Sequence, residues 1–234
     1  MPDSVQLTST RSPKPIEATV WEYNRSRSGP LRRLQLVIKR VMDLVAATLA
    51  LVVLSPILAL LALLVRLDSP GPALFKQRRL GRWGRVFTLY KLRSMVDGAP
   101  MVLNPDGSTC VVDDDPRVTH LGAKLRLLGL DELPQLLNVL KGEMSLVGPR
   151  PDHDFQRQYY ADGDYRKLVM RPGITSLAQV SGRNALSWRE RMALEIEYVE
   201  RFSLWLDLQI AFRTVGVILR GTGLNDPAPP SALS

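Results

Sequence analysis

One long apolar stretch constrains this chain more than any other feature. Residues Leu44 to Val65 carry no charged side chain and read LVAATLALVVLSPILALLALLV. As a single helix they would extend about 33 Å, enough to cross the hydrocarbon core of a bilayer. A helix buried in a water-soluble core rarely reaches this length without a charged residue. The stretch therefore predicts a membrane segment.

Two features argue against a simple span. Ser55 and Pro56 lie at its midpoint, where proline removes a backbone donor and bends the helix into arms of about 16 Å each. Both flanks are rich in basic side chains: Arg32, Arg33, Lys39 and Arg40 before the stretch, and Arg66, Lys76, Arg78, Arg79 and Arg82 after it. Because basic flanks stay on the cytoplasmic side, we expect residues 31–66 to form a re-entrant helical hairpin hinged at Ser55-Pro56. The Ser55 hydroxyl can then bind a freed backbone carbonyl, and a kinked ordinary span is the alternative.

Charge and composition limit the classes of partner and metal that the protein can bind. The formal net charge of +8 predicts an anionic partner, such as a lipid, a phosphorylated substrate or nucleic acid. Only 6% of residues are aromatic and no nucleic-acid-binding signature is present, so we expect no nucleic acid. The single cysteine excludes an internal disulfide, and two histidines argue against a histidine metal site. Any metal should be a hard, oxygen-liganded ion such as Mg²⁺.

The remaining pattern predicts an α+β fold that is mostly helical. Residues 1–30 and 222–234 are predicted to be disordered tails, and 67–221 a catalytic domain. Within this domain we expect a small β-hairpin (73–77 with 85–91), a basic amphipathic helix (117–128) suited to a membrane surface or to a core, a β-like segment (177–180) and two helices (188–201 and 204–219). Residues 113–115, three aspartates before Pro116, are interpreted as a turn and helix cap rather than a metal cluster.

Two adjacent carboxylates, Asp131 and Glu132, begin the segment LDELPQLLNVLKGEMSLVGPRP. We interpret Asp131 as the N-cap of a helix, where partial positive charge would keep it ionised and attract a phosphate. An ionised aspartate beside a phosphate is a candidate nucleophile, and Glu132 could hold a divalent ion. The alternative, favoured by the local pattern alone, is an acidic helix cap without chemistry.

Several basic residues are candidate phosphate ligands. Lys91 and Arg93 alternate, so they would share one side of a strand, and Arg183 follows a small-residue loop that permits close approach to a ligand. A solvated basic face and a surface turn are the alternatives. Asp207 interrupts an apolar helix and needs a partner such as an arginine.

Six segments of the chain resemble the bacterial sugar transferases, the monotopic phosphoglycosyl transferases, in unbroken order over about residues 35–221. They are KRVMDLVAATLALVVLSPILALLALLVRLDSPGPALFKQRRLGR, FTLYKLRSM, DPRVTHLG, LDELPQLLNVLKGEMSLVGPRP, RPGITSLAQVSGRN and SLWLDLQI. The resemblance implies transfer of a sugar-1-phosphate from a UDP-sugar to undecaprenyl phosphate with release of UMP, which starts an exported polysaccharide or glycan. The chain would be the short, catalytic form of the family.

The resemblance also implies roles for single residues. Asp131 would attack the β-phosphate to give a phosphosugar-enzyme, and Glu132 would help to bind Mg²⁺ with Asp131 beside it. Lys91, Arg150, Arg183 and Asp207 align with positions that line the active site. Ser176 stands where glycine is common, which could adjust a loop near the substrate.

The same resemblance predicts a cellular location and binding partners. The protein would lie on the cytoplasmic face of the bacterial inner membrane, in contact with membrane lipids. A homo-oligomer and downstream glycosyltransferases remain open as partners. Two other functions also remain open: a prenyl-phosphate transferase that moves the sugar without its phosphate, and a non-catalytic, membrane-tethered basic module that recruits an acidic partner.

Overall fold

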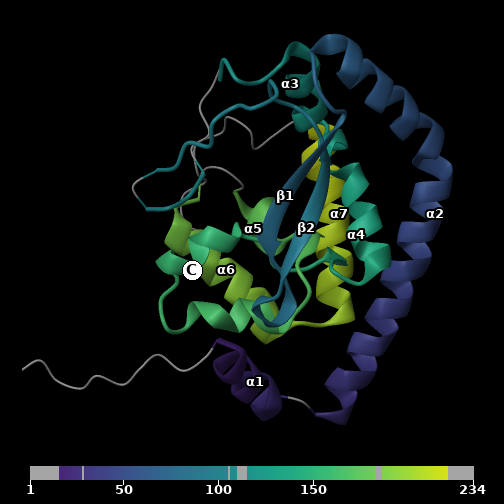
Figure 1. The fold of residues 1–234 in the computed structure, drawn as a ribbon. Coiled ribbons are helices and arrows are strands. Elements are labelled where there is room, and N and C mark those ends of the chain that lie inside the picture. Colours follow the sequence, from purple (N-terminus) through teal and green to yellow (C-terminus); the bar gives the residue numbers. More distant parts are fainter. Residues whose placement is uncertain (1–15, 28, 105, 110–114, 183–185, 221–234) are drawn as a thin grey trace, which may run out of the picture.

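The computed structural model describes residues 16–220 except 28, 105, 110–114 and 183–185 (Figure 1). Its longer elements are helices α1 (Ile16–Arg27), α2 (Pro30–Asp68), α3 (His120–Leu127), α6 (Trp188–Arg201) and α7 (Leu204–Arg220), and strands β1 (Leu74–Leu80) and β2 (Val86–Leu92). Shorter ones are η1 (Arg82–Gly84), η2 (Leu130–Gln135), α4 (Leu136–Lys141), β3 (Ser145–Val147), η3 (Asp154–Tyr159), η4 (Asp164–Val169), β4 (Gly173–Thr175) and α5 (Leu177–Ser181). The predicted mixed, mostly helical fold is confirmed in this coarse form.

Helix α2 contains the whole apolar stretch and curves along one side of the domain (Figure 1). Pro56 lies inside it without ending it, so the structure shows one continuous, curved helix and the predicted hairpin stays a prediction. Pro56 cannot donate to the carbonyl of Val52, four residues before it. The Ser55 hydroxyl donates to that same carbonyl at 2.9 Å, which confirms the predicted compensation. By length and composition, α2 can cross a membrane.

One face of α2 packs on the rest of the protein and the other stays open. Lys39, Asp43, Ala47 and Val65 are buried, and the first three recur every four residues along one side. The outer side exposes large apolar residues along its length: Val37, Val41, Val45, Leu49, Val52, Val53, Ile57, Leu60, Leu63, Leu64 and Leu67. Exposed apolar surface on this scale marks a binding or membrane surface.

The predicted hairpin is confirmed: β1 and β2 pair antiparallel from Leu74 opposite Leu92 to Leu80 opposite Val86. A second, parallel pair joins β3 to β4, with Ser145 opposite Gly173. The predicted β-like segment 177–180 is wrong, since it forms α5. The backbone there turns helical because the Ser176 hydroxyl accepts from the Gln179 N–H at 3.2 Å, as a helix N-cap does.

Three further predictions concern the bounds of helices. Helix 188–201 is confirmed as α6, with a reciprocal capping box between Ser187 and Glu190. Helix 117–128 is shorter than expected, because Thr119 rather than the aspartate cluster caps α3. Asp115 instead pairs with Arg117, and residues 113 and 114 lie outside the described part of the chain. The last helix, α7, matches the expected range.

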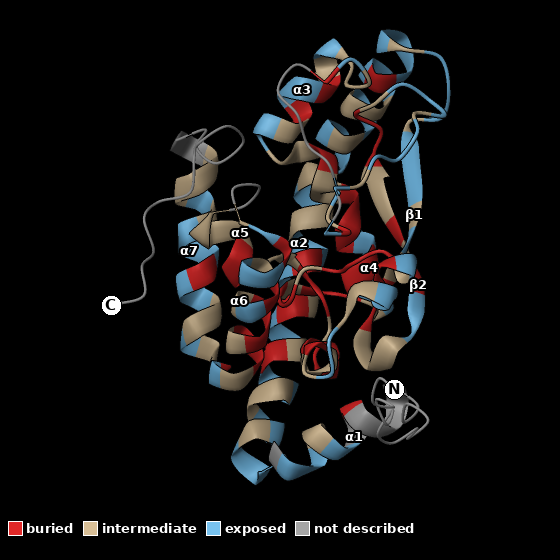
Figure 2. Cartoon of the chain, turned by 90° about the vertical axis from the view of Figure 1, so that its left-hand side faces the viewer, coloured by how far each residue is buried: buried red, intermediate tan, exposed pale blue. Residues whose placement is uncertain are grey.

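Residues 16–27 differ from the predicted disordered tail over residues 1–30, and residues 1–15 lie outside the described part of the chain. Helix α1 packs beside the C-terminal half of the domain, where Val20 is buried and Tyr23 contacts the same core (Figure 2). That core also contains Leu168, Tyr198 and Ile210. Two apolar residues three positions apart make too short a pattern to stand out in a segment dominated by polar residues. Their burial nevertheless stabilises the helix.

Candidate active site

The two carboxylates lie in a tight turn between α3 and α4. Gly129 occupies the N-cap position of η2 with a left-handed backbone (φ 66°), and no side chain caps the segment. Asp131 and Glu132 fall in its first turn. The prediction that Asp131 is itself the N-cap is therefore wrong, because the glycine turn places the start of the segment two residues earlier. A six-residue 3₁₀ segment also lacks the strong dipole that the prediction used.

Side chains from two other segments converge on these carboxylates. Lys91, near the end of β2, donates from Nζ to Glu132 Oε1 at 2.7 Å, and the same nitrogen lies 3.8 Å from Asp131 Oδ2. Arg150, just after β3, donates from Nη2 to Glu132 Oε1 at 3.3 Å. The structure thus brings together four predicted site residues from three parts of the chain.

The two carboxylates have opposite electrostatics. Burial alone would raise the pKa of Glu132, but Lys91 and Arg150 outweigh it and lower that pKa to about 2. Burial raises the pKa of Asp131, the charge of Glu132 adds to the rise, and Lys91 opposes it without cancelling it. Glu132 is consequently a fixed anion held by two cations. Asp131 keeps a more basic, less engaged oxygen, which is what a carboxylate nucleophile needs.

Two more arginines shape this site, and the sequence analysis gave neither a role in it. Arg126 of α3 donates to the Ser94 hydroxyl at 2.9 Å, and its charge acts on Asp131 to lower the carboxyl pKa. Arg79 of β1 donates to the Pro151 carbonyl at 2.8 Å. Burial, and then the charge of Arg150, lowers the pKa of Arg79 to about 9. Basic residues of this kind have no local signal, because their partners lie far away in sequence.

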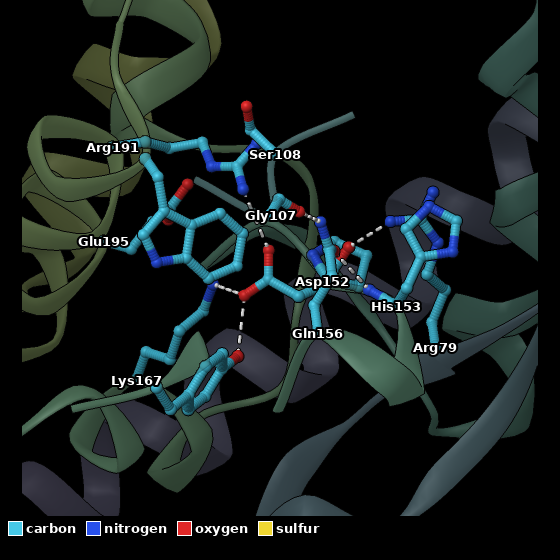
Figure 3. A network of polar contacts seen from close by, with 12 residues as sticks. Arg79, Gly107, Ser108, Asp152, His153, Gln156, Lys167, Arg191 and Glu195 are labelled. Atoms are coloured by element: carbon cyan, nitrogen blue, oxygen red, sulfur yellow. Dashed lines mark hydrogen bonds and ion pairs between the residues drawn. The ribbon is translucent and has the colours of Figure 1, made fainter. Parts of the chain in front are cut away.

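A buried polar network fixes the loop that carries Arg150 (Figure 3). Asp152 accepts from Lys167 Nζ at 2.5 Å, from the Tyr160 hydroxyl at 2.6 Å and from Arg191 Nη2 at 3.4 Å. Burial would raise the pKa of Asp152, but Lys167 and then Arg191 lower it to about 2. A buried carboxylate that accepts from three donors restrains the loop that carries it. The position of Arg150 is therefore set before any ligand arrives.

A cavity of about 280 Å³ opens beside Glu132. Most of its walls are apolar, and they come from η2, α4, β3, β4, α5 and α7. Its lining residues are Gly129, Glu132, Leu133, Leu136, Leu146, Val147, Ile174, Thr175, Gln179, Val180, Ala211, Thr214, Val217 and Ile218. This cavity has no local signal in the sequence, because it is assembled from segments nearly 90 residues apart.

Arg93 does not join the site, contrary to the prediction. Strand β2 ends at Leu92, so the alternation that would align Arg93 with Lys91 stops there. The Arg93 guanidinium is buried and donates to groups between residues 65 and 72, among them the Ser69 hydroxyl at 2.5 Å and the Pro72 carbonyl at 2.7 Å. Arg93 thus binds the C-terminal end of α2 and the turn after it, a structural role.

Asp207 also has a structural partner in place of the predicted role in binding substrate. Its Oδ2 accepts from Lys39 Nζ of α2 at 2.6 Å, and its Oδ1 accepts from the Tyr198 hydroxyl at 2.6 Å. The expected cationic partner is thus a lysine. Arg183 lies outside the described residues, so its predicted role stays a prediction.

The structure also bears on the metal and on Ser176. Within the described residues, no group of three or more His, Cys, Asp or Glu side chains could hold a metal by itself. Among the residues that the structure describes, Asp131 and Glu132 are the carboxylates that Lys91 and Arg150 contact at the site. The Ser176 hydroxyl donates to Glu195 at 2.9 Å, so this residue ties the loop before α5 to α6.

Comparison with known proteins agrees with this site. Residues 34–221 match the bacterial sugar transferase family. The chain is 45% identical over 203 residues to the UDP-glucose:undecaprenyl-phosphate glucose-1-phosphate transferase of Caulobacter vibrioides, covering 82% of this chain and 73% of that protein. It is 40% identical over 207 residues to the exopolysaccharide production protein ExoY of Rhizobium meliloti, covering 84% of this chain and 92% of that protein. The match includes both carboxylates and every described residue that contacts them, so this chain belongs to the bacterial sugar transferase family.

Proposed function

We propose that this protein transfers a sugar-1-phosphate from a UDP-sugar to undecaprenyl phosphate, with release of UMP, in the assembly of an exported polysaccharide. The observation that carries the proposal is the carboxylate pair, Asp131 and Glu132, held by Lys91 and Arg150 beside an apolar cavity that Glu132 lines. Both substrates are phosphates, which this cationic site can bind. The named relatives supply the reaction class.

The reaction follows from the different states of the two carboxylates. An Asp131 oxygen forms a bond to the phosphorus that carries the sugar, and the bond from that phosphorus to the UMP oxygen breaks. An oxygen of undecaprenyl phosphate then attacks the same phosphorus, and the bond to Asp131 breaks. Lys91 and Arg150 bind phosphate oxygens throughout and offset their charge. Glu132 is suited to remain a fixed anion and not to act as the nucleophile, because Lys91 and Arg150 both contact its carboxylate.

Mg²⁺ fits this site as an ion shared with the substrate. In proteins Mg²⁺ is commonly held by one or two carboxylates together with substrate phosphates and water, and Asp131 and Glu132 meet that need. Glu132 would be its main protein ligand. When bound, the ion would offset the negative charge of the diphosphate and polarise its oxygens.

We place the apolar outer face of α2 in the cytoplasmic membrane, with both helix ends on the cytoplasmic side. The exposed apolar residues of α2 and the basic flanks support this placement. A re-entrant arrangement would put the acceptor phosphate and the carboxylates at a similar depth. Single cysteines at positions 35 and 70 should react only from the cytoplasmic side, whereas labelling from opposite sides would show a true span.

The test of the reaction is Asp131→Asn, assayed for UMP release from a panel of UDP-sugars with undecaprenyl phosphate and Mg²⁺. We expect release to stop, and exchange of labelled UMP into UDP-sugar without acceptor to stop as well. Glu197→Gln, which removes a carboxylate from α6 away from the site, is the matched control and should remain active. Full activity of the Asp131 variant would refute the nucleophile. Release of UDP in place of UMP would show transfer of the sugar alone.

The exchange assay separates two mechanisms. If the wild-type enzyme releases UMP only when acceptor is present and never exchanges labelled UMP, direct transfer in a ternary complex replaces the covalent step. If no UDP-sugar supports either reaction, and Asp131→Asn leaves the cellular function intact, a non-catalytic membrane-tethered module is the better description.

A further inference from the structure

The cavity beside Glu132 has no part in the phosphate chemistry proposed above. Glu132 lines the cavity, and Lys91 and Arg150, which are not among its lining residues, bind Glu132, so charged groups of the substrates would bind on this side. Leu133 and Leu136 form one wall of the cavity. The occupant of this space must therefore be mostly apolar and must end in a charged group.

Helix α7 forms another wall of the cavity with one of its faces. Thr214, Val217 and Ile218 line it, at the three- and four-residue spacing that puts side chains on the same side of a helix. The opposite face of α7 exposes Trp205 and Phe212, at 67% and 75% of their surface. One helix thus connects a large exposed apolar surface to an apolar cavity at the site.

The polar groups of the cavity are too few for a sugar. Thr175 and Thr214 hydroxyl oxygens lie 2.6 Å apart and hydrogen-bond to each other. Gln179 Oε1 is the one buried acceptor of the lining that has no partner among the described residues. A hexose brings several hydroxyl groups, and each would lose water here without a replacement. A branched hydrocarbon has no hydrogen bonds to water to lose, and its transfer from water into an apolar space is favourable.

We propose that this cavity binds the phosphate-proximal isoprenyl units of the lipid acceptor, so that it is an acceptor subsite and not the sugar pocket. The inference rests on the function proposed above. The lipid phosphate lies with Lys91 and Arg150, and the hydrocarbon chain runs between η2 and α7 toward the exposed face of α7. The cavity therefore discriminates among acceptors by the shape of the first isoprenyl units.

The test fills the cavity from α7. Val217→Trp places an indole in the cavity, and Val215→Trp makes the same change on the outer face, where Val215 is 54% exposed. Two rates are measured for each: exchange of labelled UMP into UDP-sugar without acceptor, and UMP release against undecaprenyl phosphate concentration. We expect Val217→Trp to keep the exchange rate and to raise the acceptor KM by about tenfold or more, as in a hydrophobic pocket that loses room. Val215→Trp should match the wild type in both.

Each other result overturns the proposal in a distinct way. Loss of exchange in Val217→Trp, with exchange kept in Val215→Trp, would assign the cavity to the sugar donor. An unchanged acceptor KM would show that the lipid does not enter it. If Val217→Trp fails to fold, Ala211→Leu, a smaller filling of the same cavity, decides by the same criteria. Absence of both reactions in the wild type would instead refute the proposed function.

Discussion

Replacing Lys39 by methionine tests how the membrane helix is held to the domain. The Lys39 ammonium and the Asp207 carboxylate lie 2.6 Å apart, and their side chains are only 8% and 13% exposed. Asp43, four residues along α2, lies 3.7 Å from the same ammonium. Lys39→Met therefore leaves two buried carboxylates without their cation. Asp207→Leu leaves Lys39 with Asp43 still beside it.

The size of the effect follows from this burial. Removing one partner of a buried ion pair costs about 3–5 kcal/mol, because the remaining charge is left without compensation. For a domain of this size that cost corresponds to a fall in Tm of roughly 6–20 °C. We expect Lys39→Met to lower the Tm by an amount near the upper end of this range, and Asp207→Leu by an amount near the lower end. The double variant should recover most of the loss, since buried apolar pairs replace ion pairs at little cost.

Thermal unfolding in detergent micelles, followed by near-UV circular dichroism, measures these changes, and UMP release is measured on the same samples. Arg201→Met is the control, because the Arg201–Glu197 pair is exposed and should contribute about 1 kcal/mol or less. If Lys39→Met and Asp207→Leu lower the Tm no more than Arg201→Met does, burial of the Lys39–Asp207 pair does not set its contribution to stability. A double variant that is stable but inactive would refute the structural role and restore Asp207 as a substrate ligand.

Three further predictions concern the site. Burial raises the pKa of Asp131 and Lys91 opposes the rise, so Lys91→Met should raise that pKa further. The acid limb of the UMP exchange rate should then move to higher pH, and a limb that moves to lower pH would contradict the assignment. Gly173→Ala would place a Cβ 2.1 Å from the Gly148 nitrogen and separate β3 from β4. Overpacking of this kind costs about 1–3 kcal/mol, measurable as a lower Tm. Gly216→Ala is the control, because Gly216 lies in helix α7 with open space around it. Removal of Mg²⁺ with EDTA should stop UMP release without lowering the Tm by more than a few degrees, and added Mg²⁺ should restore it.

Local signals predicted the elements that local interactions decide. Helix α6 begins where Ser187 and Glu190 form a local capping box, and the β-compatible segments predicted the β1–β2 hairpin. The same kind of signal failed where one residue changed the local backbone. Ser176 turns an apolar segment into α5, and Gly129 shifts the start of η2 ahead of Asp131.

The site depended on contacts between distant residues, which local pattern does not carry. Lys91 and Glu132 lie 41 positions apart, and the pattern around each is equally compatible with a solvated surface. Resemblance to the family identified both residues, but it also assigned Asp207 to the site. Burial and hydrogen bonding distinguish Asp207 from Lys91 and Glu132, since both Asp207 carboxylate oxygens accept hydrogen bonds, one from Lys39 and one from Tyr198.

Helix α7 connects these observations. Its first turns are tied to α2 through Asp207, and a later part lines the cavity beside Glu132 with Thr214, Val217 and Ile218. The Lys39–Asp207 pair therefore joins α2 to the helix that lines the cavity. This positioning role does not require the pair to add net stability, since replacing a buried ion pair by apolar residues is often neutral.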